Sequence, residues 1–209
     1  MKRTILPAVP LGSTSPARAA GTIRPRFAVR LTRIMTPTVF ETPRIVARRI
    51  APGDAAALHA VYGDAEVVRW AGDGRPLSLA QCEEWVGVTL RNYAARGYGM
   101  FALALRNGGA LVGFGGLVHP GGQAEAEIKY AFARDAWGRG YATEVATALR
   151  RHGAEALGLR HIVATVAPQN GASQRVLLKA GFALSQLRRN DDGSFTQCFE
   201  WRADRSDGH

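Results

Sequence analysis

A glycine-rich turn between a predicted strand and a predicted helix is the feature that most limits how this chain can fold. The turn, Trp137-Gly138-Arg139-Gly140-Tyr141, follows a strand-like run at residues 127–132 and leads into a helix-like run at residues 141–157. Glycines let the backbone adopt conformations that residues with a Cβ disfavour, so a ligand can come close. The first amides of a helix lack partners within the helix and carry the positive end of its dipole. The segment therefore predicts an anion site, suited to a phosphate or pyrophosphate, with the charge of Arg139 beside it.

The pattern along the rest of the chain predicts one mixed α/β domain. Strands are expected over residues 44–50, 100–106, 111–119, 125–132, 161–166, 183–190 and 195–203. Helices are expected after Asp54 and over residues 78–96, 141–157 and 172–180. Asp54 is expected to cap the first of these helices and Ser78 the second. Residues 63–76 are expected to form a loop. A length of 209 residues fits one such domain with an appendage, and we expect the folded domain at residues 37–205.

The net charge of +10 comes mostly from the N-terminal segment. Residues 1–34 hold seven basic residues and no acid, so the rest of the chain has 20 basic residues against 17 acidic ones, a balance of +3. A nearly neutral folded part disfavours nucleic acid as a partner, because phosphate contact needs a dense basic face. We expect residues 1–36 to be a disordered basic extension. Three origins stay open: an arm for an acidic partner, an organelle transit peptide, or translation from a start codon upstream of Met35, which is favoured.

Cysteine and apolar content restrict the compartment and the cofactors. Cys82 and Cys198 stand far apart and outside any metal-ligand spacing, which indicates a reducing compartment, the cytoplasm. No apolar run approaches the roughly 20 residues that span a bilayer, so no membrane partner is expected. The five histidines form no ligand spacing, so no metal is expected.

Four motifs in order resemble the GNAT superfamily of N-acetyltransferases. They are Glu127-Ile128-Lys129-Tyr130 on a strand, the turn from Trp137 to Glu144, Asn170-x-x-Ser173 at a helix start, and Gly181-Phe182. The likeness covers about Glu41 to Trp201 and is greatest to the branch that includes ribosomal-protein alanine acetyltransferases. One glycine turn alone would be a weak signal, whereas four motifs at the expected separations are specific. The rival nicotinamide fingerprint, G-x-G-x-x-G, is disfavoured because position 143 is a threonine.

The resemblance implies an acetyl-CoA-dependent N-acetyltransferase, with acetyl-CoA as cosubstrate. Its fold would be mixed α/β, with a mostly antiparallel sheet that opens into a V and is flanked by helices. The pantetheine arm would be aligned by main-chain groups of Ala131, Phe132 and Ala133. The pyrophosphate would be held by the amides of Gly138, Arg139, Gly140, Tyr141 and Ala142, which agrees with the anion site deduced from the residues themselves.

Glu127 is the candidate general base, directly or through a water molecule, because it matches the strand glutamate of the family. Its alternative is a structural glutamate paired with Lys129 or with a nearby arginine. Lys129 departs from the family, in which a small glycine usually occupies this position. A long cation there either narrows the acceptor cleft or favours an acidic substrate, or it points into solvent.

Two residues at the start of the last predicted helix are further candidates. The residue that matches Asn170 contacts pantetheine in the family, and its alternative role is a helix cap or turn residue. Ser173 is the candidate donor of a proton, or of a hydrogen bond, to the departing sulfur, and its alternative role is also capping. Many relatives use a tyrosine one turn further along; here that position is Leu177. Trp137, which opens the glycine turn, is expected to pack beneath it.

These features predict direct acetyl transfer to a primary amine in a ternary complex. The amine belongs to a protein N-terminus or to a small molecule, and a homodimer is left open. A catalytically silent module that binds coenzyme A is the alternative function, because the glycine turn would preserve binding whereas Lys129 and Leu177 could abolish turnover.

Overall fold

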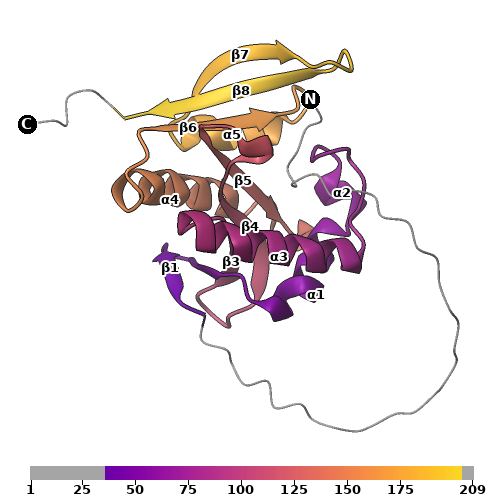
Figure 1. Ribbon diagram of the computed structural model, residues 1–209, viewed down its shortest axis with the longest axis vertical. Coiled ribbons are helices and arrows are strands. Elements are labelled where there is room, and N and C mark those ends of the chain that lie inside the picture. Colours follow the sequence, from indigo (N-terminus) through magenta and orange to yellow (C-terminus); the bar gives the residue numbers. More distant parts are fainter. Residues whose placement is uncertain (1–35, 204–209) are drawn as a thin grey trace, which may run out of the picture.

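An eight-stranded sheet runs through residues 36–203, the part of the chain that the computed structural model describes (Figure 1). The strands are β1 (Thr38–Glu41), β2 (Ile45–Arg49), β3 (Met100–Leu105), β4 (Leu111–Val118), β5 (Ala126–Phe132), β6 (His161–Val166), β7 (Ala183–Arg189) and β8 (Phe195–Arg202). Their order in space is β1-β2-β3-β4-β5-β6-β8-β7, so the hairpin of β7 and β8 lies at the opposite end of the sheet from β1. Every neighbouring pair is antiparallel except β5 and β6. The mixed α/β fold with a mostly antiparallel sheet is thus confirmed.

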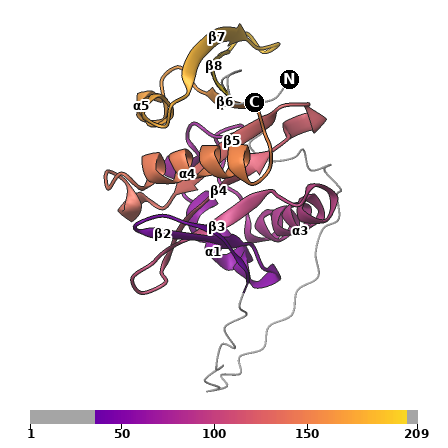
Figure 2. The same cartoon turned by 90° about the vertical axis from the view of Figure 1, so that its left-hand side faces the viewer.

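Helices cover both faces of this sheet (Figure 2). They are α1 (Ala55–Tyr62), α2 (Ala65–Val68), α3 (Leu79–Arg96), α4 (Tyr141–Glu155) and α5 (Gly171–Lys179). Helix α1 packs on β4 and β5 and is covered by α3, whereas α4 contacts β1, β4 and β5, and α5 contacts β6 and β7. Two apolar clusters result, one around Leu58 and Phe114 near α1 and one around Leu149 and Ile162 near α4. Both clusters bury apolar side chains against the sheet, which holds the strands of the site in place.

The parallel strands β5 and β6 pair over a short distance and then separate. Their register contains only Ala126 with Ile162 and Glu127 with Val163. Beyond these pairs β6 continues along β8 through Val166, while β5 continues along β4 through Phe132. The sheet therefore opens between β5 and β6. This split leaves one edge of β5 without a strand partner from residue 128 to Phe132, a few residues before the glycine turn.

Some local predictions need correction. Strand β1 and helix α2 were not predicted, and α2 occupies part of the segment 63–76 that was expected to be a loop. The capping box of Ser78 and Gln81 is confirmed. Asp54 precedes α1 as expected, but its carboxylate does not cap that helix. It accepts hydrogen bonds from the Arg48 guanidinium, at 2.7 Å, and from the amide of Ala51, at 2.7 Å. A bidentate guanidinium is the stronger partner for this carboxylate.

The described region ends close to the predicted domain limits. The basic extension expected at residues 1–36 lies outside it except for Thr36, and so do residues 204 and 205. Within residues 36–203, no helix is long and apolar enough to cross a bilayer. Both cysteines are free thiols, and Cys82 is buried.

Candidate functional site

The glycine turn forms an open cradle at the N-terminus of α4. Gly138 and Gly140 both have positive φ, 72° and 81°, and Gly140 is the N-cap of α4. A Cβ added at Gly138 would meet nothing within 4 Å, so the backbone is open on that side. Among residues 36–203, no backbone hydrogen bond uses the amides of residues 138–143. Several unpaired donors at the positive end of a 15-residue helix are suited to a polyanion.

Arg44, immediately before β2, contacts this turn although Arg44 and Arg139 are 95 residues apart in sequence. Its amide and its Nε donate to the Glu144 carboxylate at 2.9 and 2.7 Å, and its Nη1 donates to the carbonyl of Arg139 at 2.8 Å. Its guanidinium also lies 4.7 Å from the ring centre of Tyr141. Burial opposes the charge of Glu144, but hydrogen bonds from Thr42 and Arg44 outweigh it and lower the pKa of this carboxyl. The pair places an arginine beside the cradle and neutralises the acid in the first turn of α4.

Some main-chain groups at the end of β5 already have hydrogen-bond partners within the protein. The amide of Ala133 donates to Val112 at 2.9 Å, and its carbonyl accepts from Ala136 at 3.0 Å. By the alternation of a strand, the main-chain groups of Ala131 also face β4, whereas those of Phe132 face the split. The carbonyl of Phe132 accepts the indole N–H of Trp137 at 2.8 Å. The amide of Phe132 is therefore the group of this segment that best faces an extended ligand.

Trp137 does not lie beneath the turn as expected. The residue is 49% exposed, and its indole N–H joins the turn to the end of β5 through the Phe132 carbonyl. The hydrogen bond to the strand edge needs the ring beside the turn rather than under it. Trp137 thus ties the turn to the end of β5 while much of its side chain stays open to solvent.

Glu127 and Lys129 form a buried ion pair at the base of the split. The Lys129 ammonium donates to Glu127 Oε1, and the side chains are 6% and 4% exposed for Lys129 and Glu127. Thr165 of β6 donates its hydroxyl to the same carboxylate oxygen and accepts from Lys129 Nζ at 3.1 Å. The structure thus has the pairing that was the alternative for Glu127, and Lys129 does not point into solvent. Thr165 was missed by sequence reasoning because it comes from another strand.

The start of α5 brings three polar side chains together on the other face of β5. Asn170 is the N-cap of α5, and its Oδ1 accepts the amide of Ser173 at 3.1 Å. The cap uses only the oxygen of this side chain, so the amide hydrogens of Asn170 stay available to a ligand. The Ser173 hydroxyl lies 2.9 Å from the hydroxyl of Tyr130, which sequence reasoning did not single out. Burial raises the pKa of Tyr130 to about 12, so the phenol is protonated at neutral pH. Leu177 is buried in the core.

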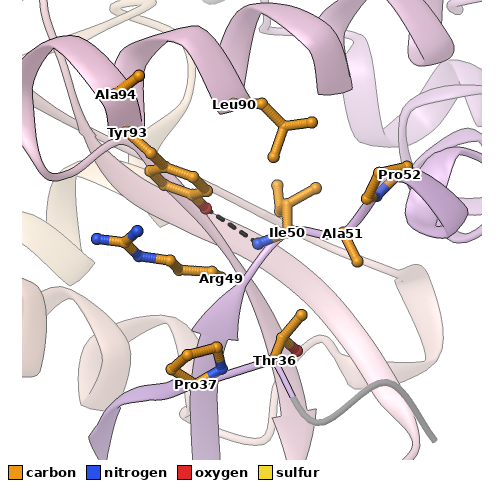
Figure 3. Close-up of a pocket in the computed structure, with 9 residues that line it drawn as sticks. All are labelled: Thr36, Pro37, Arg49, Ile50, Ala51, Pro52, Leu90, Tyr93 and Ala94. Atoms are coloured by element: carbon orange, nitrogen blue, oxygen red, sulfur yellow. Dashed lines mark hydrogen bonds between the residues drawn. The ribbon is translucent and has the colours of Figure 1, made fainter.

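A separate hollow of about 440 Å³ lies away from these residues (Figure 3). It is lined by Thr36 and Pro37, by residues at the end of β2, and by Leu90, Tyr93 and Ala94 of α3. Within its lining, the amide of Ile50 donates a hydrogen bond to the Tyr93 hydroxyl at 3.0 Å. None of the predicted site residues lines it, and nothing in its lining suits acyl chemistry. In the same described part of the chain, no three His, Cys, Asp or Glu side chains are grouped to hold a metal ion.

The predicted site residues lie along β5 and at the starts of α4 and α5. A cradle for an anion at α4 is followed by the free edge of β5 and then by the split, where Glu127 and Lys129 lie on one face. Tyr130 and Ser173 lie on the other face. Such an arrangement can hold a long ligand with a charged end and bring its other end to polar side chains on both faces of the sheet.

Sequence comparison identifies relatives of this chain. The acetyltransferase (GNAT) domain family matches residues 44–183. The uncharacterized N-acetyltransferase YoaA of Bacillus subtilis is 33% identical over 146 residues, which cover 69% of this chain and 82% of YoaA. The family match includes the glycine turn, and each of the two matches covers most of the described residues.

Comparison with solved structures gives the same picture. An acetyltransferase from Agrobacterium tumefaciens has a TM-score of 0.69 and 27% identity, and the match covers 88% of this chain and all of that chain. RimL, a ribosomal L7/L12 alpha-N-protein acetyltransferase in complex with coenzyme A, has a TM-score of 0.69 at 18% identity, covering 80% of this chain and 99% of RimL. At that identity the likeness to RimL concerns the fold alone.

Proposed function

Because the chain belongs to the acetyltransferase (GNAT) domain family, we propose that it moves an acetyl group from acetyl-CoA to a primary amine by direct transfer in a ternary complex. The cradle at α4 is the observation that carries this proposal, since its unpaired amides fit the diphosphate of a coenzyme A thioester. Residues 37–205 would form the catalytic domain, and residues 1–36 an extension to it.

The residues around the split fit the whole length of acetyl-CoA. Gly138, Arg139, Gly140, Tyr141 and Ala142 would hold the diphosphate, and Arg44 would fix the turn through its hydrogen bond to the Arg139 carbonyl. The amide of Phe132 would bond the pantetheine arm, with Ala131 and Ala133 bordering it, and Asn170 would contact the arm from α5. The complex of RimL with coenzyme A supports this assignment as a neighbour of the same fold. When bound, acetyl-CoA supplies an activated acetyl carbonyl and a thiolate leaving group.

Glu127 would act as the general base for the incoming amine. An attacking amine must lose a proton as its nitrogen bonds to the acetyl carbon and the C–S bond breaks. The Lys129 ammonium and the Thr165 hydroxyl both donate to Glu127 Oε1, so they fix the position of the carboxylate that would accept this proton. Holding the reactants together in the split supplies much of the acceleration, up to about 7–11 kcal/mol. The base is thus one contribution among several.

Ser173 would protonate the departing sulfur. Its hydroxyl bonds that of Tyr130, which is kept protonated by burial and can replace the proton that Ser173 gives away. The Ser173 amide donates the capping hydrogen bond to Asn170 Oδ1, which fixes the backbone from which the Ser173 side chain projects. This pair would take the place of the helix tyrosine that Leu177 replaces.

The acceptor would be a protein N-terminus or a small-molecule amine. Its choice would depend on α1, α3 and the segment between them at residues 63–76, because connecting segments of this kind commonly carry binding residues. Several proteins of the same fold are ribosomal-protein acetyltransferases by name, among them RimL and a ribosomal-protein-S5-alanine acetyltransferase from Vibrio fischeri. They support a peptide N-terminus as the first acceptor to test.

One observation favours the silent coenzyme A-binding module as the second candidate. Lys129 already forms an ion pair with Oε1 of the Glu127 carboxylate, so an external amine would compete with this buried cation for the candidate base. A module of this kind keeps the cradle and loses turnover.

Thiol release from acetyl-CoA separates the two candidates. The full chain is incubated with acetyl-CoA and a panel that holds a peptide N-terminal amine, an amino acid, a polyamine and an aminoglycoside. Amine-dependent release is expected for at least one of the four. Binding of acetyl-CoA by calorimetry without amine-dependent release for any amine would favour the silent module instead.

The pH–rate profile tests the base. Replacing Glu127 by Gln keeps the shape of the side chain and removes its basicity, so the rising limb of the profile should shift. A profile that is unchanged in Glu127→Gln would remove Glu127 from the role of base, and the assignment of acetyl transfer would then rest on the cradle alone.

A further inference from the structure

Lys129 is a rare residue type in this chain and has an unusual place. The chain has 27 Lys and Arg residues, but only Lys2, Lys129 and Lys179 are lysines, which leaves 24 arginines. In the described residues, Lys179 is exposed on α5, whereas Lys129 is 6% exposed in the split. Arginine would bind a carboxylate with two hydrogen bonds and stays charged. Lysine differs because its amine can lose a proton and act as a nucleophile.

The Lys129 amine lies where the two strands of the split part. Glu127 of β5 and Val163 of β6 form the last registered pair of the two strands. Thr165 lies two residues beyond Val163 on β6 and therefore on the same face of the sheet. Lys129 Nζ contacts the Glu127 carboxylate and the Thr165 hydroxyl at once, so it bridges β5 and β6 directly above that pair. A primary amine on the candidate base, at the apex of the opening, occupies the place that an acceptor amine needs.

We propose that Lys129 is an internal acceptor and that the protein acetylates it. This inference rests on the proposed function, because the acetyl donor is the thioester of acetyl-CoA held along β5. Glu127 takes one proton from the Lys129 ammonium and passes it to solvent. Nζ then bonds to the acetyl carbon, the C–S bond breaks with its electron pair on sulfur, and sulfur takes the second proton that nitrogen loses. The products are Nε-acetyl-Lys129 and free coenzyme A.

Acetylation of Lys129 limits itself and changes the site. The acetylated side chain is neutral, so it no longer forms an ion pair with Glu127. Each chain holds one such amine in the split, so the reaction consumes one acetyl group per chain and then stops. An external amine that reaches Glu127 first competes with Lys129 for the same acetyl group, which makes the internal reaction fastest in the absence of an acceptor.

The experiment uses the full chain and acetyl-CoA without any added amine. Peptide mass spectrometry should find an acetyl group on Lys129, and thiol release should show a burst equal in amount to the protein. Exposed Lys179 reports non-enzymatic acetylation in the same sample. Acetyl phosphate replaces acetyl-CoA as a donor without the pantetheine arm, so it cannot bind the cradle and present its acetyl group along β5 at the same time. Lys129→Arg should abolish the burst while keeping a cation beside Glu127. The matched control, Lys179→Arg, should keep it.

The same data can overturn the inference. Lys129 that stays unmodified overturns it, and so does Lys129 that is modified no faster than Lys179 or equally fast by acetyl phosphate. Calorimetry with acetyl-CoA and thiol release with the amine panel separate this failure from that of the proposed function. Unmodified Lys129 with amine-dependent release leaves the proposed function standing, whereas absence of acetyl-CoA binding removes both.

Discussion

The ion pair of Glu127 and Lys129 leads to a prediction about stability that can be worked out in detail. With side chains 4% and 6% exposed, either partner left alone is a buried charge without a counter-ion. Removing one member of such a pair costs about 3–5 kcal/mol of the free energy of unfolding. Glu127→Gln and Lys129→Met are the single variants, because each keeps the approximate volume of its side chain. For a domain whose total stability is roughly 5–15 kcal/mol, each should lower the urea midpoint strongly.

The double variant Glu127→Gln/Lys129→Met decides whether the loss belongs to the pair. It buries no charge, so its stability should lie closer to that of the unchanged chain than either single variant does, with an interaction energy of about 3 kcal/mol. Urea unfolding followed by circular dichroism measures all four proteins. The exposed pair Arg151–Glu155, with side chains 61% and 71% exposed, is the control and should couple by about 0.3–0.5 kcal/mol. Single losses below about 1 kcal/mol that simply add in the double variant would refute the reasoning.

Three further predictions concern the cradle, the sheet and acid stability. Gly138→Ala forces a non-glycine residue to φ 72°, which should cost about 1–2 kcal/mol of folding free energy and weaken acetyl-CoA binding in calorimetry, whereas Gly53→Ala, in open space, should change neither. Gly116→Ala would push its Cβ against the carbonyl oxygen of Gly99, just before β3, and should lower the free energy of unfolding by about 1–3 kcal/mol. Gly87→Ala within α3 has room for its Cβ and should raise that free energy by about 0.5–1 kcal/mol, and thermal unfolding measures both variants. The lowered pKa of the Glu144 carboxyl stabilises the fold fully above the ordinary value of 4.5, and this stabilisation is lost as pH falls through the folded value. Glu144→Gln removes the titrating group, so it should flatten the acid limb of a plot of unfolding free energy against pH. An unchanged acid limb would contradict this.

Local sequence patterns were sufficient for most of the fold. The hairpin of β3 and β4 was predictable because Asn107-Gly108-Gly109 between two apolar runs favours a tight turn. Both glycines have positive φ in the structure, as such a turn requires. Strand β1 and helix α2 have four residues each, too few for a period to be recognised. β1 exists because β2 supplies its hydrogen-bond partners, and that information does not lie within its own residues.

Within the candidate site, features built from neighbouring residues were predictable from the sequence, whereas contacts between distant segments were not. The cradle was predictable because its glycines, its cation and the helix that follows are contiguous in sequence. The pairing of Glu127 with Lys129 could be named as an alternative, since residues two apart on a strand share a face. Their third partner, Thr165, could not, because it depends on the register of two strands that meet only briefly. The contact of Arg44 with Glu144 joins residues 100 positions apart and needed the folded structure.

The claim on which the account depends is that the amides at the N-terminus of α4 bind the diphosphate of acetyl-CoA. Titration calorimetry with acetyl-CoA and with acetyl-pantetheine, which carries the same thioester but no diphosphate, tests it most directly. Hydrogen bonds to charged groups contribute about 1.5–3 kcal/mol each, so loss of two of them should weaken binding by at least about 100-fold. Tight binding of acetyl-CoA with that loss for acetyl-pantetheine is the predicted result. Equal affinity for the two compounds, or no heat with acetyl-CoA, would contradict the account.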